Sequence, residues 1–418
     1  MAVSNTHANR CYTGVILDDV TSYDRASSYP DVIVNMPFPV KPFIKQDITK
    51  IDELLDGFPY LLAIEFRDIE QIDPFYGCPY LSIHKCYNLV GAVNDNGRVL
   101  EAKRLFTYLT SVDLEIVSQQ YKWSRAVIVS CYRSEYGLLP EAMKNVTMDY
   151  YEKKTKLKGV DGQEVYYMKS KNKLNSIYGM TATNPVRTNL VFNGTNFEVK
   201  ETDEQEQLRK ANKRAFCCFA WGCWTTAWAR YWLEKAIRLC GDKFVYCDTD
   251  SVKFVGEVDF TELNKEIQAN SESNGAFAYD PQGVCHYLGV YECESDKDES
   301  GKYLPTYKRF ITLGAKKYAY EDRNGKLHIT VAGVSKSGAA ELGKLENFKD
   351  GFIFHESGGM EALYNDEWGE PITVDGHTLE FPPNIYLSKG EYTLGLTLEY
   401  KRLFHLTQEQ FDKIIKSR

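Results

Sequence analysis

The chain has 418 residues, which is enough to bury a sizeable core and to divide into two or three subdomains. It shows no amino-terminal signal peptide, and its longest apolar run, residues 215–229, is too short to cross a bilayer. Its eleven cysteines are an odd number without paired CxxC spacing. Cys217, Cys218 and Cys223 lie in an apolar helix with no nearby histidine, which favours small core residues over zinc ligands. We therefore expect a globular protein of a reducing cytoplasm, without a membrane partner.

The formal charge of −8 is concentrated in one segment. Residues 256–299 contain eleven acidic side chains against Lys265 and Lys297, a local net charge of −9, so the rest of the chain carries about +1. We interpret the segment as an outward-facing acidic insertion. A basic groove for nucleic acid elsewhere in the chain is therefore compatible with the acidic total.

Strands and helices are expected to alternate irregularly, without an internal repeat. A strand-like run at 13–17 comes first, and the Asn-Gly pairs at 96–97 and 324–325 predict two hairpins. Two helices broken near Gly159–Gly162 are expected over 139–178, and a long apolar helix over 214–239 ends at Gly241. The region 330–418 mixes strands with Gly-rich turns and closes with a charged helix.

The segment Tyr246-Cys247-Asp248-Thr249-Asp250-Ser251 lies between two apolar strands. Two carboxylates so close together repel each other and lose hydration, and a divalent cation relieves that conflict. A metal-binding turn is therefore one interpretation. An Asp-rich surface turn remains open on local grounds.

Asp24 ends a strand and is followed by Arg-Ala-Ser-Ser-Tyr-Pro. Backbone N–H groups of such a tight segment can hold phosphate oxygens, and Tyr29 can pack beneath a sugar. The alternative is a simple strand-to-helix turn with Asp24 as its cap.

Lys171, Asn175 and Tyr178 share one face of a predicted helix, which suits a triphosphate and a base. A solvated lysine-rich face is the alternative, because six more lysines lie nearby: 153, 154, 156, 158, 169 and 173. Lys316-Lys317-Tyr318, on the strand before the second Asn-Gly pair, can hold a nucleic-acid backbone. It can equally be an exposed edge strand.

Taken in order, these four segments resemble the signature of family B DNA polymerases. DRASSYP resembles the palm motif DxxSLYP with Ser28 in place of leucine, KNKLNSIYG fits the fingers motif KxxxNSxYG, YCDTDS fits the palm motif YxDTDS, and KKY fits KxY. The chain looks most like the protein-primed bacteriophage polymerases. Two features depart from the family. Neither the 3′–5′ exonuclease domain nor its YxGG linker motif is visible before Asp24, so we expect a split gene, a truncated chain or a polymerase without proofreading. The segment between Phe254 and Lys316 is also long for this subgroup.

The resemblance implies an α+β right-hand polymerase with an antiparallel palm sheet, short helical fingers and a small thumb. The implied domain bounds are these: palm 1–138 with an insertion near 69–105, fingers 139–181, a second insertion 182–213, palm 214–330 with the acidic insertion 256–299, and thumb and tail 331–418.

The resemblance also implies two-metal phosphoryl transfer with two Mg²⁺ ions, for which Mn²⁺ can substitute. The metal ligands would be Asp24, Asp250 and the backbone carbonyl of Arg25, with Asp248 as a supporting carboxylate. The deoxynucleotide would be bound by Ser27, Ser28, Tyr29, Lys171, Asn175, Tyr178 and Gly179. The primer would be held by Lys316, Tyr318, Thr249 and Ser251.

The implied partners are primer-template DNA, deoxynucleoside triphosphates, a terminal protein primer and a separately encoded exonuclease domain. If the chain is encoded by a phage, its location is the cytoplasm of the bacterial host. Reverse transcriptases and viral RNA polymerases also use palm aspartates, but they usually place two of them adjacent, whereas Thr249 separates them here. The alternative function is that of one half of a split polymerase, acting as an inactive DNA-binding subunit without its partner.

Overall fold

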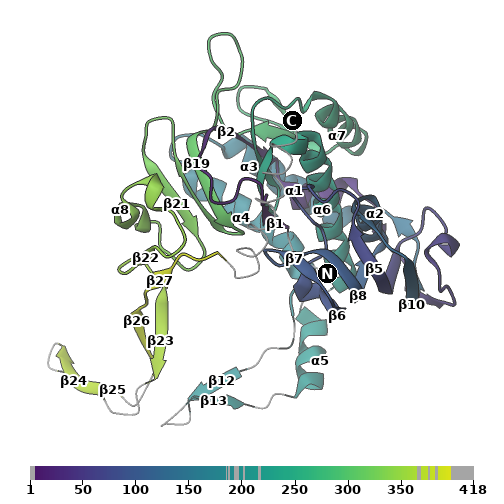
Figure 1. The fold of residues 1–418 in the computed structure, drawn as a ribbon, viewed down its shortest axis with the longest axis horizontal. Helices are drawn as coiled ribbons and strands as arrows, with labels where there is room; N and C mark the ends of the chain where they lie inside the picture. Colours follow the sequence, from purple (N-terminus) through teal and green to yellow (C-terminus); the bar gives the residue numbers. More distant parts are fainter. Residues whose placement is uncertain are drawn as a thin grey trace, which may run out of the picture.

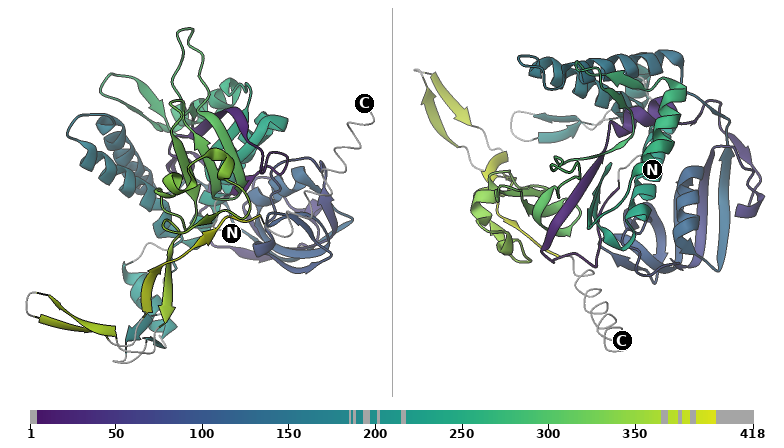
Figure 2. Two further views of the ribbon diagram at one scale, coloured as in Figure 1. Left: turned by 60° about the vertical axis from the view of Figure 1, so that its left-hand side comes forward. Right: turned by 90° about the horizontal axis from the view of Figure 1, so that it is seen from above.

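The computed structural model describes residues 5–184, 186, 189–192, 197–200, 203–214, 218–364, 369–374, 377–381 and 385–396. Two antiparallel sheets stand on either side of one long helix, α6 (Phe219–Cys240) (Figures 1 and 2). Helix α6 packs against strands of the central sheet on one side and against the helix and a strand of the second sheet on the other. No helix in the described ranges is long and apolar enough to cross a membrane.

The central sheet joins strands from distant parts of the chain. Its order is β1 (Thr6–Ala8), β14 (Phe244–Asp248), β15 (Ser251–Val255), β2 (Leu17–Arg25), β19 (Tyr307–Gly314), β20 (Lys317–Glu321) and β21 (Leu327–Val331), and β18 (Tyr291–Cys293) also pairs with β2. All of these pairings are antiparallel. The expected strand at 13–17 was placed too early, because Gly14 adopts a φ of +78° in a turn and β2 begins only at Leu17.

The second sheet is built from one continuous stretch of chain. It contains β4 (Ile44–Gln46), β10 (Arg125–Arg133), β5 (Tyr60–Gln71), β8 (Arg98–Thr110) and β6 (Cys86–Val90), with β7 (Val93–Asp95) on β8 and β9 (Tyr121–Lys122) on β5. Helix α2 (Ser111–Gln120) follows β8, and the sheet has its own apolar core. The sheet therefore extends well beyond the range 69–105 that the sequence suggested for an insertion.

Four further helices pack against one another or against α6. They are α1 (Ser28–Asn35), α3 (Glu141–Leu157), α4 (Glu164–Thr181) and α7 (Thr261–Asn274). The two helices expected over 139–178 are confirmed as α3 and α4, and Gly159 and Gly162 both have positive φ in the break. Gly222 lets the end of α4 approach α6, because a Cβ there would lie 2.8 Å from the Cβ of Ala182.

The acidic segment 256–299 is not an outward-facing insertion. The segment, which includes α7 and β18, contributes Phe260, Ile267, Leu288 and Tyr291 to the main apolar core. Strand β18 is hydrogen-bonded to β2 within the central sheet. The expectation was wrong because charge counting does not reveal that apolar residues are interspersed at buried positions of this segment.

The remaining elements are short. They are the pairs β3 (Phe38–Pro39) with β11 (Tyr136–Gly137), β12 (Asn189–Phe192) with β13 (Phe197–Lys200), β16 (Phe277–Tyr279) with β17 (Cys285–Tyr287), β22 (Ile353–Phe354) with β27 (Tyr392–Thr393), β23 (Met360–Tyr364) with β26 (Ile385–Lys389) and β24 (Gly369–Val374) with β25 (His377–Phe381); the helices α5 (Glu204–Arg214) and α8 (Gly338–Leu342); and the 3₁₀ turns Ile51–Glu53, Ile83–Lys85, Gly241–Lys243 and Leu345–Asn347. Both predicted hairpins are present, β7–β8 at Asn96-Gly97 and β20–β21 at Asn324-Gly325. The predicted charged helix at the end of the chain lies outside the described residues.

Candidate active site

The structure brings Asp24 and Asp250 together at the centre of the central sheet. Asp24 lies near the end of β2, directly opposite Ser251 on β15, the residue after Asp250. The backbone N–H of Arg25 donates to the carbonyl of Asp250 at 3.1 Å. Two carboxylates more than 200 residues apart in sequence are therefore held side by side by strand register.

Both carboxylates are destabilised in their charged form. Burial and the neighbouring charge of Glu294 raise the pKa of Asp24 to about 6, against the partial compensation of Lys253. Burial and the charge of Asp24 itself raise the pKa of Asp250 to about 7. Both carboxylates are thus harder to ionise than a free aspartate, Asp24 because of burial and Glu294, and Asp250 because of burial and Asp24, as expected of a site that binds a cation.

Asp248 is already occupied by protein partners. Its carboxylate accepts hydrogen bonds from the Thr6 hydroxyl at 2.9 Å and from Lys316 Nζ at 2.6 Å. Thr249, between the two aspartates, has a φ of +61°, which is strained for a β-branched residue. Its N–H donates to the carbonyl of Asn5 at 2.8 Å. The turn is therefore held in a strained form by strand β1.

The segment after Asp24 forms a tight turn into α1. Ser27 adopts a left-handed conformation with a φ of +53°. The buried Arg25 guanidinium donates to the Gly289 carbonyl at 3.1 Å, to the Ser28 hydroxyl at 3.1 Å, and to the Asp31 carboxylate. Arg25 thus stabilises this turn by linking it to α1 and to the Gly289 backbone.

Helix α4 carries four of the predicted nucleotide-binding residues and packs against α1, which carries Tyr29. The rings of Tyr29 and Tyr178 stack with centroids 4.4 Å apart. Lys171, Asn175 and Gly179 lie on exposed positions of the same helix. The stacked pair brings the DRASSYP segment into contact with the KNKLNSIYG segment, two motifs that were identified separately in the sequence.

Lys154 of α3 is a site residue that the sequence did not distinguish from its lysine neighbours. Its Nζ donates to the Ser27 hydroxyl at 2.8 Å. Burial, together with the positive charges of Lys158 and Lys171, lowers the pKa of Lys154 to about 8. The signal was the buried stripe at 147, 151 and 155, which places Lys154 beside the packed face of the helix.

Lys253 and Glu294 form a second group beneath Asp24 that the sequence did not reveal. Lys253 is 3% exposed, and its Nζ lies 3.3 Å from the Ser22 hydroxyl and 3.2 Å from the Ser251 hydroxyl. The Ser22 hydroxyl donates to Glu294 at 2.5 Å. Burial lowers the pKa of Lys253, and the nearby carboxylates, Glu294 first, oppose that shift.

The predicted primer-binding residues lie beside the aspartates. Lys316 precedes β20 and contacts Asp248. Tyr318 stacks on Phe310 with centroids 5.5 Å apart and lies 5.1 Å from the ring of Tyr246. Lys316 therefore offers its ammonium at the surface of the site, whereas Tyr318 is partly buried in an aromatic cluster.

The donor chemistry of the site fits magnesium. In the described part of the chain, no group of three or more His, Cys, Asp or Glu side chains could hold a metal ion by itself. Magnesium is usually bound by one or two carboxylates completed by substrate phosphates and water. Asp24 and Asp250, partly buried and both raised in pKa, match that requirement.

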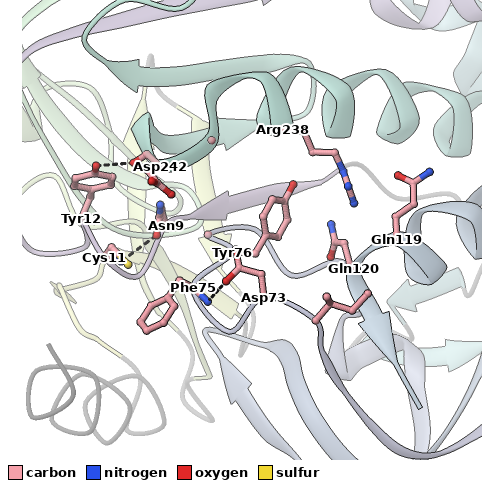
Figure 3. A pocket seen from close by; sticks show the side chains of 13 residues that line it. Asn9, Cys11, Tyr12, Asp73, Phe75, Tyr76, Gln119, Gln120, Arg238 and Asp242 are labelled. Atoms are coloured by element: carbon pink, nitrogen blue, oxygen red, sulfur yellow. Dashed lines mark hydrogen bonds between the residues drawn. The ribbon is translucent and has the colours of Figure 1, made fainter. Parts of the chain in front are cut away.

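A cavity of about 500 Å³ lies apart from this site. It is lined by the connection between β1 and β2, by residues that follow β5 and by the end of α6. Figure 3 shows Tyr12, Tyr76, Arg238 and Asp242 around this cavity. Tyr76 donates to Glu234 at 2.7 Å, and Arg238 donates to the same carboxylate at 2.8 Å. None of the predicted site residues lines it, so the cavity is not the predicted catalytic centre.

The sequence and the fold were compared with those of known proteins. The DNA polymerase of Bacillus phage B103 is 26% identical over 253 residues, covering 59% of this chain and 40% of that protein. The DNA polymerase of Bacillus phage phi29 is 31% identical over 167 residues, covering 38% of this chain and 26% of that protein. The chain thus matches about two fifths or less of the length of these relatives.

The fold matches a solved polymerase structure over nearly the whole chain. Phi29 DNA polymerase complexed with primer-template DNA and incoming nucleotide superposes with a TM-score of 0.64 at 21% identity, covering 93% of this chain and 60% of that chain. The orthorhombic crystal form of the same enzyme gives a TM-score of 0.62. The predicted right-hand fold with an antiparallel palm sheet is thereby confirmed.

The family model for DNA polymerase type B, organellar and viral, matches residues 5–265, more than half of the chain. This range contains the Asp24 turn, the α4 motif and the DTD turn. The chain therefore belongs to the organellar and viral type B DNA polymerases.

Proposed function

We propose that the chain is a DNA-directed DNA polymerase that adds deoxynucleotides to a primer 3′-hydroxyl by two-metal phosphoryl transfer. The observation that carries the proposal is the partly buried pair Asp24 and Asp250, which strand register holds together and whose pKa values are both raised. Such a pair, next to a strained turn, is typical of a site that binds divalent cations.

The metal-binding residues would be Asp24, Asp250 and the Arg25 carbonyl. A pair of Mg²⁺ ions bound there would lower the pKa of the primer hydroxyl and neutralise the leaving pyrophosphate. Asp248 supports the site through Lys316 and is not needed as a ligand, because its oxygens already accept hydrogen bonds.

Positively charged side chains would bind the triphosphate. Lys171 lies exposed on α4, and Lys154 reaches the turn of Ser27 from α3. Lys154 contacts the Ser27 turn, and the charge of Lys171 on the adjacent helix is close enough to lower the pKa of Lys154; two neighbouring positive charges suit a polyphosphate. The Ser27 and Ser28 amides would add hydrogen bonds.

The aromatic pair would define the sugar and base position. Tyr29, stacked on Tyr178, would lie under the deoxyribose and exclude a 2′-hydroxyl. Asn175 and Gly179 would complete the wall against which the new base pair closes. Lys316 and Tyr318 would hold the primer strand, with Thr249 and Ser251 beside its end.

The proposed partners are primer-template DNA and deoxynucleoside triphosphates. The phi29 structures are of a polymerase complexed with primer-template DNA, which supports a similar ligand here. A terminal protein primer and a separately encoded exonuclease domain are further proposed partners.

Single-nucleotide primer extension by the purified chain in Mg²⁺, with Mn²⁺ in parallel, tests the proposal. We expect template-matched incorporation by the wild type and none by Asp250→Ala. Asp242→Ala, an exposed aspartate near the base of β14, is the matched control and should keep wild-type activity. DNA binding without incorporation in either metal, even with an exonuclease fragment added, would instead support the inactive subunit of a split polymerase.

A further inference from the structure

The β7–β8 hairpin of the second sheet lies beside β1, the edge strand of the central sheet (Figure 1). Asp95, at the end of β7, is fully buried. His7 Nε2 and Arg10 NH1 of the amino-terminal segment each lie 3.5 Å from its carboxylate. A buried carboxylate between two basic side chains fixes the hairpin against β1.

The tip of the same hairpin also contacts the end of β19. A Cβ at Gly314 would lie 2.7 Å from Nδ2 of Asn96, and Gly314 has a φ of +137°. Glycine is therefore required where the tip meets the chain. Two residues later, Lys316 makes its ion pair with Asp248.

Arg98, the first residue of β8, connects the hairpin to the catalytic turn. One of its guanidinium nitrogens donates to the Tyr80 carbonyl at 2.9 Å, and the other donates to Oδ1 of Asn5. Asn5 is 4% exposed, and its backbone carbonyl accepts the N–H of Thr249 at 2.8 Å. The next residue, Thr6, donates to Asp248.

We propose that the β7–β8 hairpin braces the catalytic turn and that Arg98 is a positioning residue for incorporation. This inference rests on the proposed polymerase function. Thr249 is held in a strained conformation, which persists only where neighbouring groups fix it. Arg98 fixes Asn5, and Asn5 fixes Thr249, so the second sheet helps to set the position of the carboxylates on either side.

Removal of the guanidinium should slow the chemical step without weakening substrate binding. We expect Arg98→Met to lower kcat about tenfold, because a small displacement of reacting groups has a large effect on rate. The KM for the nucleotide and the Kd for primer-template should stay within about twofold of wild type. Arg98→Lys, which keeps a donor toward Asn5, should recover part of the loss.

Arg104→Met is the matched control. Arg104 lies on the same strand, but its side chain is exposed and forms an ion pair with Glu65 at 2.7 Å. Among the described residues, Arg104 is hydrogen-bonded to Glu65 and contacts neither Asn5 nor the catalytic turn, so kcat should not change. Asn5→Ala should reproduce the Arg98→Met loss, and the double variant should be no slower than either single one.

Thermal unfolding of each variant separates positioning from stability. If Arg98→Met does not fold, Arg98→Lys and Asn5→Ala decide the question. The inference is overturned if kcat is unchanged, if kcat and primer-template affinity fall together, or if the Asn5 and Arg98 effects add. An inactive wild type would refute the proposed function instead, which the same assay reveals first.

Discussion

Replacement of Asp250 with asparagine is expected to stabilise the metal-free protein while it abolishes nucleotide incorporation. Asp250 is partly buried beside Asp24, and the loss of hydration together with the charge of Asp24 raises its pKa to about 7 from an ordinary value of 3.8. Asparagine has nearly the same shape but no charge to bury. The variant therefore removes a repulsion that the wild type bears in the absence of cations.

The expected difference in the free energy of unfolding follows from the shift in the pKa of Asp250. The folded protein keeps the Asp250 proton to a higher pH than the unfolded chain, so wild-type stability is lost as pH rises from about 4 to about 7. A shift of about three units corresponds to about 4 kcal/mol above pH 7, as an upper limit for a coupled pair. At pH 5 only about 1.5 kcal/mol of that difference has developed.

Urea unfolding in EDTA at pH 5 and pH 8 measures the difference. We expect the advantage of Asp250→Asn to grow with pH, and added Mg²⁺ to stabilise the wild type more than the variant. Single-nucleotide extension on the same samples measures activity. A variant that is less stable than the wild type at pH 8 without metal, or that extends a primer at the wild-type rate, would refute the reasoning.

Three further predictions concern neighbours of this pair. Tyr29→Val should reduce discrimination between deoxy- and ribonucleotides about tenfold, measured as the ratio of kcat/KM values, and unchanged discrimination would contradict its position under the sugar. Lys154→Met should raise the KM for the incoming nucleotide about tenfold, whereas Lys153→Met, an exposed lysine paired with Asp149, should not. Lys253→Met should shift the acidic limb of the pH–rate profile to higher pH, because Lys253 lowers the pKa of Asp24; a limb that stays or moves down would disprove that role.

The DTD turn could be singled out from sequence because its local pattern is strong, whereas Asp24 was assigned to the same site only through the resemblance to family B polymerases. Asp248 and Asp250 interrupt two apolar strands, and a fixed side-chain alternation indicates which residues share a face. The helical hairpin was predictable for the same reason, since Gly159 and Gly162 break a periodic pattern. These features depend on neighbours within a few residues.

Residues that act through distant partners could not be predicted in this way. Lys253 looks like an ordinary strand lysine until Ser22 and Glu294 are placed beside it by strand pairing. Arg98 follows a common Asn-Gly turn, and only the fold brings it to Asn5. A single sequence contains no information on which strands become neighbours.

The acidic segment acquires a role from its place in the sheet. Glu292 of β18 lies directly opposite Asp24 on β2, and Glu294 follows two residues later. Burial lowers the pKa of Lys154 and of Lys253, and Glu292 and Glu294, respectively, partly offset that lowering, so each acid favours the charged form of a lysine near the site. With all groups ionised, five carboxylates and three lysines leave a net charge of about −2 around the site; they are Asp24, Asp248, Asp250, Glu292, Glu294, Lys154, Lys253 and Lys316. Such a moderate negative balance attracts divalent cations, while the lysines limit the mutual repulsion of the carboxylates before the cations bind.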